Sequence, residues 1–147
     1  MAHKYILRGN NTMEITLTGK NNTELTLKVN RSNIEVYAEL PQINFEYSDS
    51  FSMSQFLIEI ASKVWKDFKP KEANSFSSDY CEFYDRKLDN NGYLEILQNK
   101  TLSFEAPYVE EKQKQYLLYR FNKRKMQSFC YDLAQLEKTS KIIGQSN

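Results

Sequence analysis

The strongest constraint on the fold is a change of hydrophobic period between the first third of the chain and the segment that follows it. Residues 13–39 alternate apolar and polar side chains in three runs, MEITLTG, ELTLKV and NIEVYAEL, separated by GKNN and NRSN. Alternation with period two predicts strands with one buried and one exposed face, and Asn, Gly and Ser between the runs favour tight turns. The sequence therefore predicts an antiparallel meander, with further strands expected in KYIL before it and INFEY after it.

The next segment has the period of a helix. In FSMSQFLIEIASKVWKDF, residues 51–68, apolar side chains recur every three or four positions. Ser52 and Gln55 have capping-box spacing, and Phe51 and Phe56 have the spacing of a hydrophobic staple. A helix over about 52–68 is therefore expected to cover the apolar face of the meander. Its stripe consists of Met53, Phe56, Leu57, Ile60, Val64 and Phe68, and Trp65 lies at the edge, where core packing and contact with a partner are both open.

Strand signals return after the polar segment 69–79. YCEFYDRKL and YLEILQ are joined by DNNG, and the pair Asn91-Gly92 is a strong hairpin signal. Alternation in this hairpin predicts that Cys81 and Phe83 face inward, toward Leu94 and Ile96.

The last third predicts more strand and a closing helix. TLSFE and YLLYRF have strand character, and Asn122 is placed to cap a helix over about 123–138, with Met126, Phe129, Cys130, Leu133 and Leu136 on its apolar face. We therefore predict an α+β fold, in which an antiparallel sheet made of the N-terminal meander, the hairpin and a further strand packs with two helices. Residues 1–147 are expected to form a single domain with a frayed tail from about residue 139.

Several kinds of chemistry are missing from the sequence. His3 is the only histidine, and its place near the N-terminus argues against Ser-His-Asp, Cys-His and histidine-based metal sites. The four glycines form no phosphate-binding loop. Cys81 and Cys130 form no CxxC motif and are expected to be buried thiols rather than a disulfide. No catalytic residue, cofactor or metal site is predicted, and the enzyme class that stays open would use carboxylates alone.

Charge is distributed unevenly along a chain whose net charge is only +1. Residues 1–34 carry a net +3, residues 35–111 a net −8, and residues 112–147 a net +6. Such asymmetry favours charged partners, although complementary halves of one fold would show it as well.

The acidic part contains the candidate partner-binding residues. On the outward face of the hairpin we expect Tyr80, Glu82, Tyr84, Tyr93 and Glu95, with Asp85 close by. Tyrosine offers contact area at a small entropic cost, and carboxylates attract basic partners. The alternative is an ordinary polar sheet face, in which paired tyrosines stabilise the hairpin.

The basic part contains a second candidate, the segment RFNKRKMQ with Arg120, Lys123, Arg124 and Lys125. These side chains suit contact with nucleic-acid phosphates. Cations at the start of a helix oppose its dipole, so their position is unfavourable locally. A solvated charged run is the alternative interpretation.

The order of elements resembles that of small immunity-type proteins of bacterial polymorphic toxin systems. The resemblance covers most of residues 13–137 and depends on the strand meander, the helix SQFLIEIASKVW, the polar loop, the hairpin with NGYLEI, and the closing strand and helix. It implies a cytosolic protein that binds and neutralises one cognate toxin. The acidic middle of the chain agrees with that role, because nuclease toxins are basic.

Three function classes therefore compete. The favoured class is a non-enzymatic inhibitor or immunity protein whose partner is a protein with a basic surface. The others are a phage-encoded or regulatory nucleic-acid-binding protein and an enzyme with carboxylate chemistry. The start MAHKYILRGN has no apolar leader, and no run approaches the length of a membrane span, so we expect a cytoplasmic location without membrane insertion.

Overall fold

The computed structural model describes residues 2–8, 12–74 and 79–146, with side chains for residues 12–74 and 79–139. Its strands form two antiparallel sheets, and the predicted α+β class is confirmed. The first sheet has the order β1 (Ala2–Arg8), β2 (Thr12–Thr18), β3 (Glu24–Val29), β4 (Ile34–Ala38) and β9 (Tyr116–Phe121). The second has the order β5 (Gln42–Glu46), β8 (Thr101–Glu105), β7 (Asn90–Leu97) and β6 (Glu82–Asp85).

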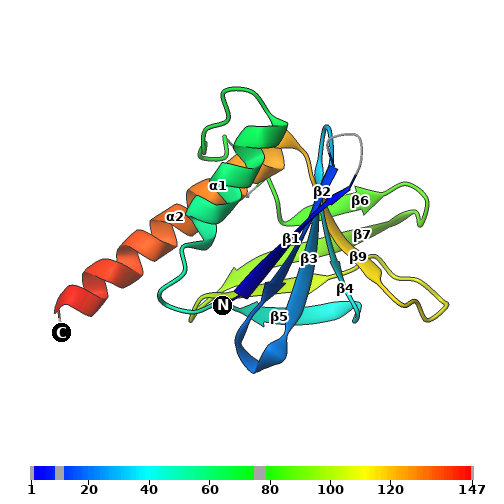
Figure 1. Ribbon diagram of the computed structural model, residues 1–147, viewed down its shortest axis with the longest axis horizontal. Coiled ribbons are helices and arrows are strands. Elements are labelled where there is room, and N and C mark those ends of the chain that lie inside the picture. Colours follow the sequence, from blue (N-terminus) through cyan, green and yellow to red (C-terminus); the bar gives the residue numbers. More distant parts are fainter. Residues whose placement is uncertain (1, 9–11, 75–78, 147) are drawn as a thin grey trace.

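The two sheets share one core. The alternation predicted for residues 13–39 is confirmed, because Ile15, Leu17, Leu25, Leu27, Ile34 and Val36 are all buried. Opposite them lie buried residues of the second sheet, namely Phe45, Phe83, Leu94, Leu102 and Phe104. The meander is therefore covered largely by another sheet, while the helices lie side by side at one end of the sheets (Figure 1).

A single sheet, as the sequence analysis expected, does not form. The strand predicted in INFEY exists as β5, but it pairs with β8 and not with the meander. The chain bends at residues 39–41 after β4, and the Pro41 carbonyl accepts a hydrogen bond from the Ala106 amide at 2.7 Å. Alternation defines the two faces of a strand but does not determine which strand it pairs with. The division of the strands between two sheets could therefore not be predicted from the alternation.

Helix α1 (Met53–Val64) begins as predicted and ends earlier than predicted. The Ser52 side chain accepts from the Gln55 amide at 3.2 Å, and the Phe51 and Phe56 rings lie 5.5 Å apart, which confirms the cap and the staple. The helix stops at Trp65, whose backbone is extended. Trp65 then stacks on the buried Phe68 at 5.9 Å, so it belongs to the edge of the core.

The start of α1 is also held by a carboxylate from the other helix. Glu137 accepts hydrogen bonds from the Ser52 hydroxyl at 3.0 Å, from the Ser54 amide at 3.1 Å and from the Ser54 hydroxyl. A negative charge at this position is favourable, because the first amides of a helix carry partial positive charge. The contact fixes α1 against α2.

Helix α2 (Lys123–Ser146) is longer than the predicted 123–138. Its cap is confirmed, since Asn122 Oδ1 accepts from the Lys125 amide at 2.8 Å. Met126, Phe129, Cys130 and Leu133 are buried, whereas Leu136 is 48% exposed and lies outside the core. Fraying from about residue 139 stays a prediction. Within the described chain neither helix combines the length and the apolarity that a membrane crossing needs.

Strand β9 connects the two sheets through aromatic side chains. Tyr119 lies 4.4 Å from Phe121 and 5.3 Å from Phe83 between ring centroids, and Phe129 lies 5.3 Å from Phe121 and 5.1 Å from Tyr80. The Tyr119 hydroxyl donates to the Tyr80 carbonyl at 2.6 Å. We call these five residues the aromatic cluster, and it joins β6, β9 and α2.

Gly92 has a different role from the one its sequence context indicates. The hairpin turns at residues 86–89, and Gly92 lies inside β7, paired with Phe83. A Cβ atom on Gly92 would lie 2.9 Å from the Leu118 carbonyl oxygen and 2.9 Å from the Phe83 ring. The glycine therefore permits close approach of β9 to the hairpin and does not supply a turn conformation.

The burial of α1 predicts a large effect at Ile60, which is 2% exposed. Ile60→Ala should lower the free energy of unfolding by about 2–5 kcal/mol, because it leaves a cavity in the core. Urea denaturation measures the change. The control Glu59→Ala, at an exposed position of the same helix, should change it by less than about 0.5 kcal/mol. A loss below about 1 kcal/mol at Ile60 would contradict this packing.

The position of Gly92 gives a second prediction. Gly92→Ala should destabilise the fold by about 1–3 kcal/mol in urea denaturation, because the new methyl group meets a backbone oxygen. Asn91→Ala is the control, since a turn at residues 91–92 would tolerate it poorly, whereas a strand position should lose less than about 1 kcal/mol. Equal losses in the two variants would restore the turn interpretation.

Candidate binding surface

The outer face of the second sheet carries exposed tyrosines between carboxylates. The register places Glu82 of β6, Tyr93 of β7, Glu105 of β8 and Gln42 of β5 in one row. In the next row Tyr84 faces Asn91. Tyr84 is 55% exposed and Tyr93 is 43% exposed. We call the residues Glu82, Tyr84, Tyr93, Glu95 and Glu105 the Tyr–Glu face.

The carboxylates of this face are available for an outside partner. Among residues 12–74 and 79–139, no ion pair joins Glu82, Glu95 or Glu105 to a basic side chain. Glu82 accepts one hydrogen bond from the Asn91 side chain at 3.1 Å. The Tyr84 hydroxyl donates to Asp89, and this hydrogen bond raises the pKa of Tyr84 above its usual value. The face therefore combines negative potential with aromatic contact area.

Four of the six predicted partner-binding residues lie on this face, namely Glu82, Tyr84, Tyr93 and Glu95. Tyr80 was expected there and is buried instead, with its hydroxyl donating to Asp132 at 2.7 Å. Cys81, expected inside, is exposed. The reason is that β6 begins only at Glu82, so residues 80 and 81 precede the regular alternation.

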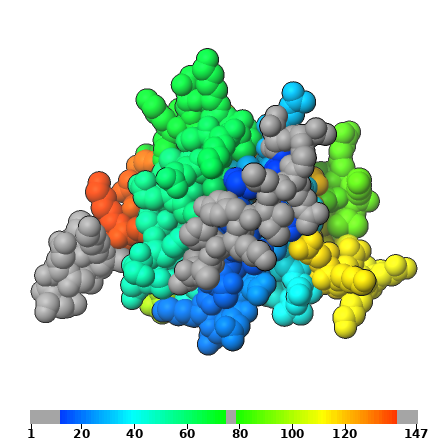
Figure 2. Space-filling model, viewed as in Figure 1, coloured from blue at the N-terminus to red at the C-terminus, as the bar shows by residue number. Residues whose placement is uncertain are grey.

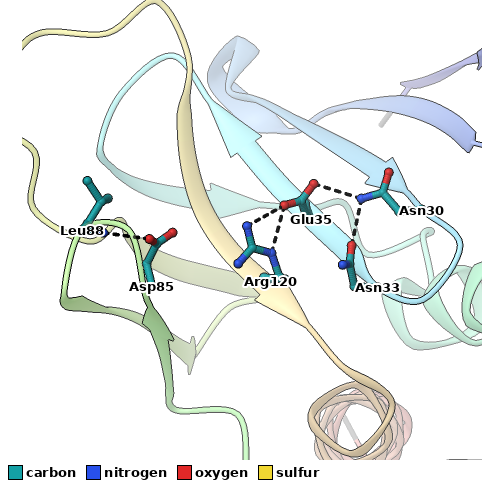
Figure 3. A network of polar contacts seen from close by, with 6 residues as sticks. All are labelled: Asn30, Asn33, Glu35, Asp85, Leu88 and Arg120. Atoms are coloured by element: carbon teal, nitrogen blue, oxygen red, sulfur yellow. Dashed lines mark hydrogen bonds and ion pairs between the residues drawn. The ribbon is translucent and has the colours of Figure 1, made fainter.

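Asp85 is also directed away from the face. It is 6% exposed, and its carboxylate accepts from the Leu88 amide at 3.0 Å, as Figure 3 shows. A carboxylate at this point closes the hairpin turn by bonding a backbone amide three residues on. Asp85 is thus a turn residue, and the structure does not bring it together with the exposed side chains of the face.

Three residues were missed by the sequence analysis, one on the Tyr–Glu face and two beside it. Glu105 comes from β8, Gln42 from β5, and Tyr108 follows β8 with 70% of its side chain exposed. Their grouping depends on the β5–β8–β7 order, which no local pattern gives. The available signal was the alternation within TLSFE, which places Glu105 outward.

The basic segment of the C-terminal third is largely occupied by contacts within the chain. Arg120 forms an ion pair with Glu35 at 2.9 Å, and Arg124 forms one with Asp79 at 3.6 Å. Lys125 donates to the carbonyl groups of Asp79 and Glu82, at 3.1 and 2.6 Å. Burial lowers the pKa of Lys125. Three of the four predicted phosphate-binding cations are therefore used within the fold. Arg124 and Lys125 connect α2 to the chain at the start of the hairpin, and Arg120 connects β9 to β4.

A second charged cluster lies on the outer face of the first sheet. Glu14, Lys28, Glu35 and Arg120 face one another in turn across β2, β3, β4 and β9, so the charges alternate. Figure 3 shows Glu35 between Arg120 and the Asn30 side chain, which donates to it at 2.9 Å. This arrangement satisfies its charges internally and is best explained as cross-strand stabilisation.

Tyr37 belongs to the same cluster. Burial and the neighbouring Glu35 carboxylate raise the pKa of its hydroxyl to about 12, and the Lys28 ammonium lies 4.3 Å from its ring centroid. Burial likewise raises the pKa of the Cys130 thiol to about 12. Of the two cysteines, only Cys130 is buried as the sequence analysis predicted.

Elsewhere on the surface, fewer side chains are placed to bind a ligand. An open groove of about 810 Å³ lies beside the start of α1, where Glu137 already bonds the helix, and its lining includes Lys100 and Lys138. In the part of the chain with described side chains, no three His, Cys, Asp or Glu residues are grouped closely enough to hold a metal ion.

No family model matches the chain, and comparison with curated proteins and with solved structures finds no match.

The raised pKa of Tyr37 gives a prediction for alkaline solutions. In the unfolded chain this tyrosine ionises near pH 10, whereas in the folded protein it stays neutral to about pH 12. The stability that it contributes is therefore present below about pH 10 and is lost as the pH rises toward its folded pKa. Urea denaturation from about pH 9 to about pH 11 should show a steeper loss for the wild type than for Tyr37→Phe. An equal loss of unfolding free energy in the wild type and in Tyr37→Phe would contradict the burial of this hydroxyl.

Proposed function

We propose that the chain is a cytoplasmic, non-catalytic protein-binding module that inhibits a cognate toxin through the Tyr–Glu face. The observation that carries the proposal is the exposure of Tyr84 and Tyr93 on a sheet face where Glu82, Glu95 and Glu105 form no ion pair among the described side chains. Tyrosine is enriched in protein interfaces because its ring supplies apolar area and its hydroxyl supplies a hydrogen bond.

The electrostatics of the face favour a basic protein surface. Glu82 and Glu105 flank Tyr93 on the two neighbouring strands, and Glu95 follows two residues later on the same face. Exposed carboxylates of one sign accelerate the encounter with a basic partner. Buried tyrosines would then slow dissociation, because interface energy is concentrated in a few central aromatic and arginine contacts.

A nucleic-acid partner is supported less well. Phosphate binding needs cations that are free to replace counterions. Arg120, Arg124 and Lys125 instead bond carboxylates or carbonyl groups of the chain itself. The most exposed aromatic surface is acidic, and it would repel phosphates. The balance of these contacts favours a protein partner.

Association and dissociation rates test the proposal. With the product of a neighbouring toxin gene as the immobilised partner, Glu82→Lys combined with Glu95→Lys should slow association about tenfold at low salt and flatten its salt dependence. Tyr84→Ala or Tyr93→Ala should instead speed dissociation about tenfold or more, because about 2 kcal/mol of buried contact is lost. Surface plasmon resonance over a salt series measures both.

The matched control combines Glu24→Lys with Glu59→Lys, which changes the net charge equally at exposed positions of β3 and α1. It should leave both rates close to the wild-type values. Thermal unfolding of all variants establishes that each is folded. Binding that is unchanged in the Tyr–Glu variants, or reduced equally by the control, would rule out this face as the binding surface.

A further inference from the structure

The Tyr–Glu face deepens beside Tyr93 into a pocket of about 330 Å³. Its walls come from the start of β5, the start of β7 and the segment that follows β8. The side chains that define its chemistry are Pro41, Gln42, Asn91, Tyr93, Glu105 and Tyr108. Figure 2 shows the segment around residues 107–115, in yellow, projecting from the molecule beyond the body of the sheets.

The pocket is built on paired backbone rather than on a loose loop. Tyr93 and Gln42 are the direct register partners of Glu105, one on each side. The Ala106 amide donates to the Pro41 carbonyl at 2.7 Å, which closes the pocket between β5 and the end of β8. The Gln113 amide donates to the Tyr116 hydroxyl at 3.0 Å and restrains the segment beyond Tyr108. The backbone of Glu105 is therefore held in place between Tyr93 and Gln42, and its exposed side chain lines the pocket.

Glu105 is the one charged side chain among the residues that line the pocket. Within the described residues no basic side chain forms an ion pair with it. Tyrosine rings attract cations to their faces, and this attraction adds to that of a nearby carboxylate. The side-chain oxygens of Gln42 and Asn91 are further acceptors for N–H groups. An anion would be repelled here, and an apolar group would bury the carboxylate without compensation.

We propose that this pocket binds the guanidinium of an arginine on the protein partner. A guanidinium is planar, so it stacks on a tyrosine ring while its N–H groups bond a carboxylate in pairs. A lysine ammonium has a compact, strongly hydrated charge and gains less from a flat aromatic wall. The inference rests on the proposed function for the nature of the partner, and its chemistry is tested with a small probe alone.

The probe is N-acetyl-arginine N-methylamide, added to the ¹⁵N-labelled protein at low salt. Its addition should shift the amide resonances of Tyr93, Glu105 and Tyr108 with millimolar affinity. The citrulline analogue has the same shape without the charge, and it should bind at least about threefold more weakly. The lysine analogue should also bind more weakly than arginine. Equal shifts with citrulline or lysine would overturn the assignment of a guanidinium pocket.

Two variants locate the site. Glu105→Gln keeps the shape of the side chain and should weaken arginine binding about three- to tenfold, and Tyr108→Ala, at an exposed position, should weaken it by a similar factor. Glu24→Gln, on the other sheet, is the control and should have no effect. Unchanged affinity in Glu105→Gln would place any arginine binding elsewhere and overturn the proposal.

The arginine-amide titration and the toxin-binding experiment together distinguish a failure of the pocket proposal from a failure of the inhibitor proposal. If the arginine amide binds as described while no Tyr–Glu variant alters toxin binding, the inhibitor proposal fails and the pocket stands. If toxin binding requires the Tyr–Glu face while the arginine amide produces no shifts, the pocket fails alone.

Discussion

The aromatic cluster around β9 is the packing on which the rest of the structure depends. Strand β9 is hydrogen-bonded to β4 in the first sheet, and Tyr119 and Phe121 on it contact Phe83 of the hairpin and Phe129 of α2. Each such ring pair contributes about 0.5–1.5 kcal/mol beyond the burial of its area. Burial raises the pKa of Tyr119, whose hydroxyl bonds the chain just before β6. Gly92 permits this close approach, so the hairpin, the second sheet and α2 are positioned together.

This packing separates the charged residues into two groups with different roles. Glu35, Arg120, Arg124 and Lys125 bond to groups of the chain around the junction of β4, β9 and α2. Glu82, Glu95 and Glu105 project outward from β6, β7 and β8, on the face of the second sheet opposite to the one from which Phe83 and Leu94 point into the core. Because Phe83 and Leu94 pack into the core, the alternating side chains Tyr84 and Tyr93 on the same strands face the solvent. The same strands stabilise the core with one face and offer the candidate surface with the other.

Local patterns predicted most of the elements, and long-range pairing explains the misses. Period-two alternation identified β2 to β4, and the caps at Ser52 and Asn122 follow from spacing alone. The pairing of β5 with β8 depends on contacts far apart in sequence, so local patterns could not predict a second sheet or the position of Glu105 beside Tyr93. Tyr80 was misplaced because the alternation of YCEFYD was extended into residues that lie before the strand. Asp85 was expected near the face from its sequence position alone, and its carboxylate bonds an amide of the turn instead.

Side-chain footprinting with hydroxyl radicals can test whether the Tyr–Glu face binds the partner, because it reports the exposure of individual aromatic residues in the free protein and in its complex. Tyr84, Tyr93 and Tyr108 should react in the free protein, where they are exposed, and should be protected when the partner binds. Tyr37, on the outer face of the first sheet, should react equally in both states. Protection of Tyr37 with unchanged reaction at the three tyrosines would place the binding surface elsewhere and rule out the Tyr–Glu face.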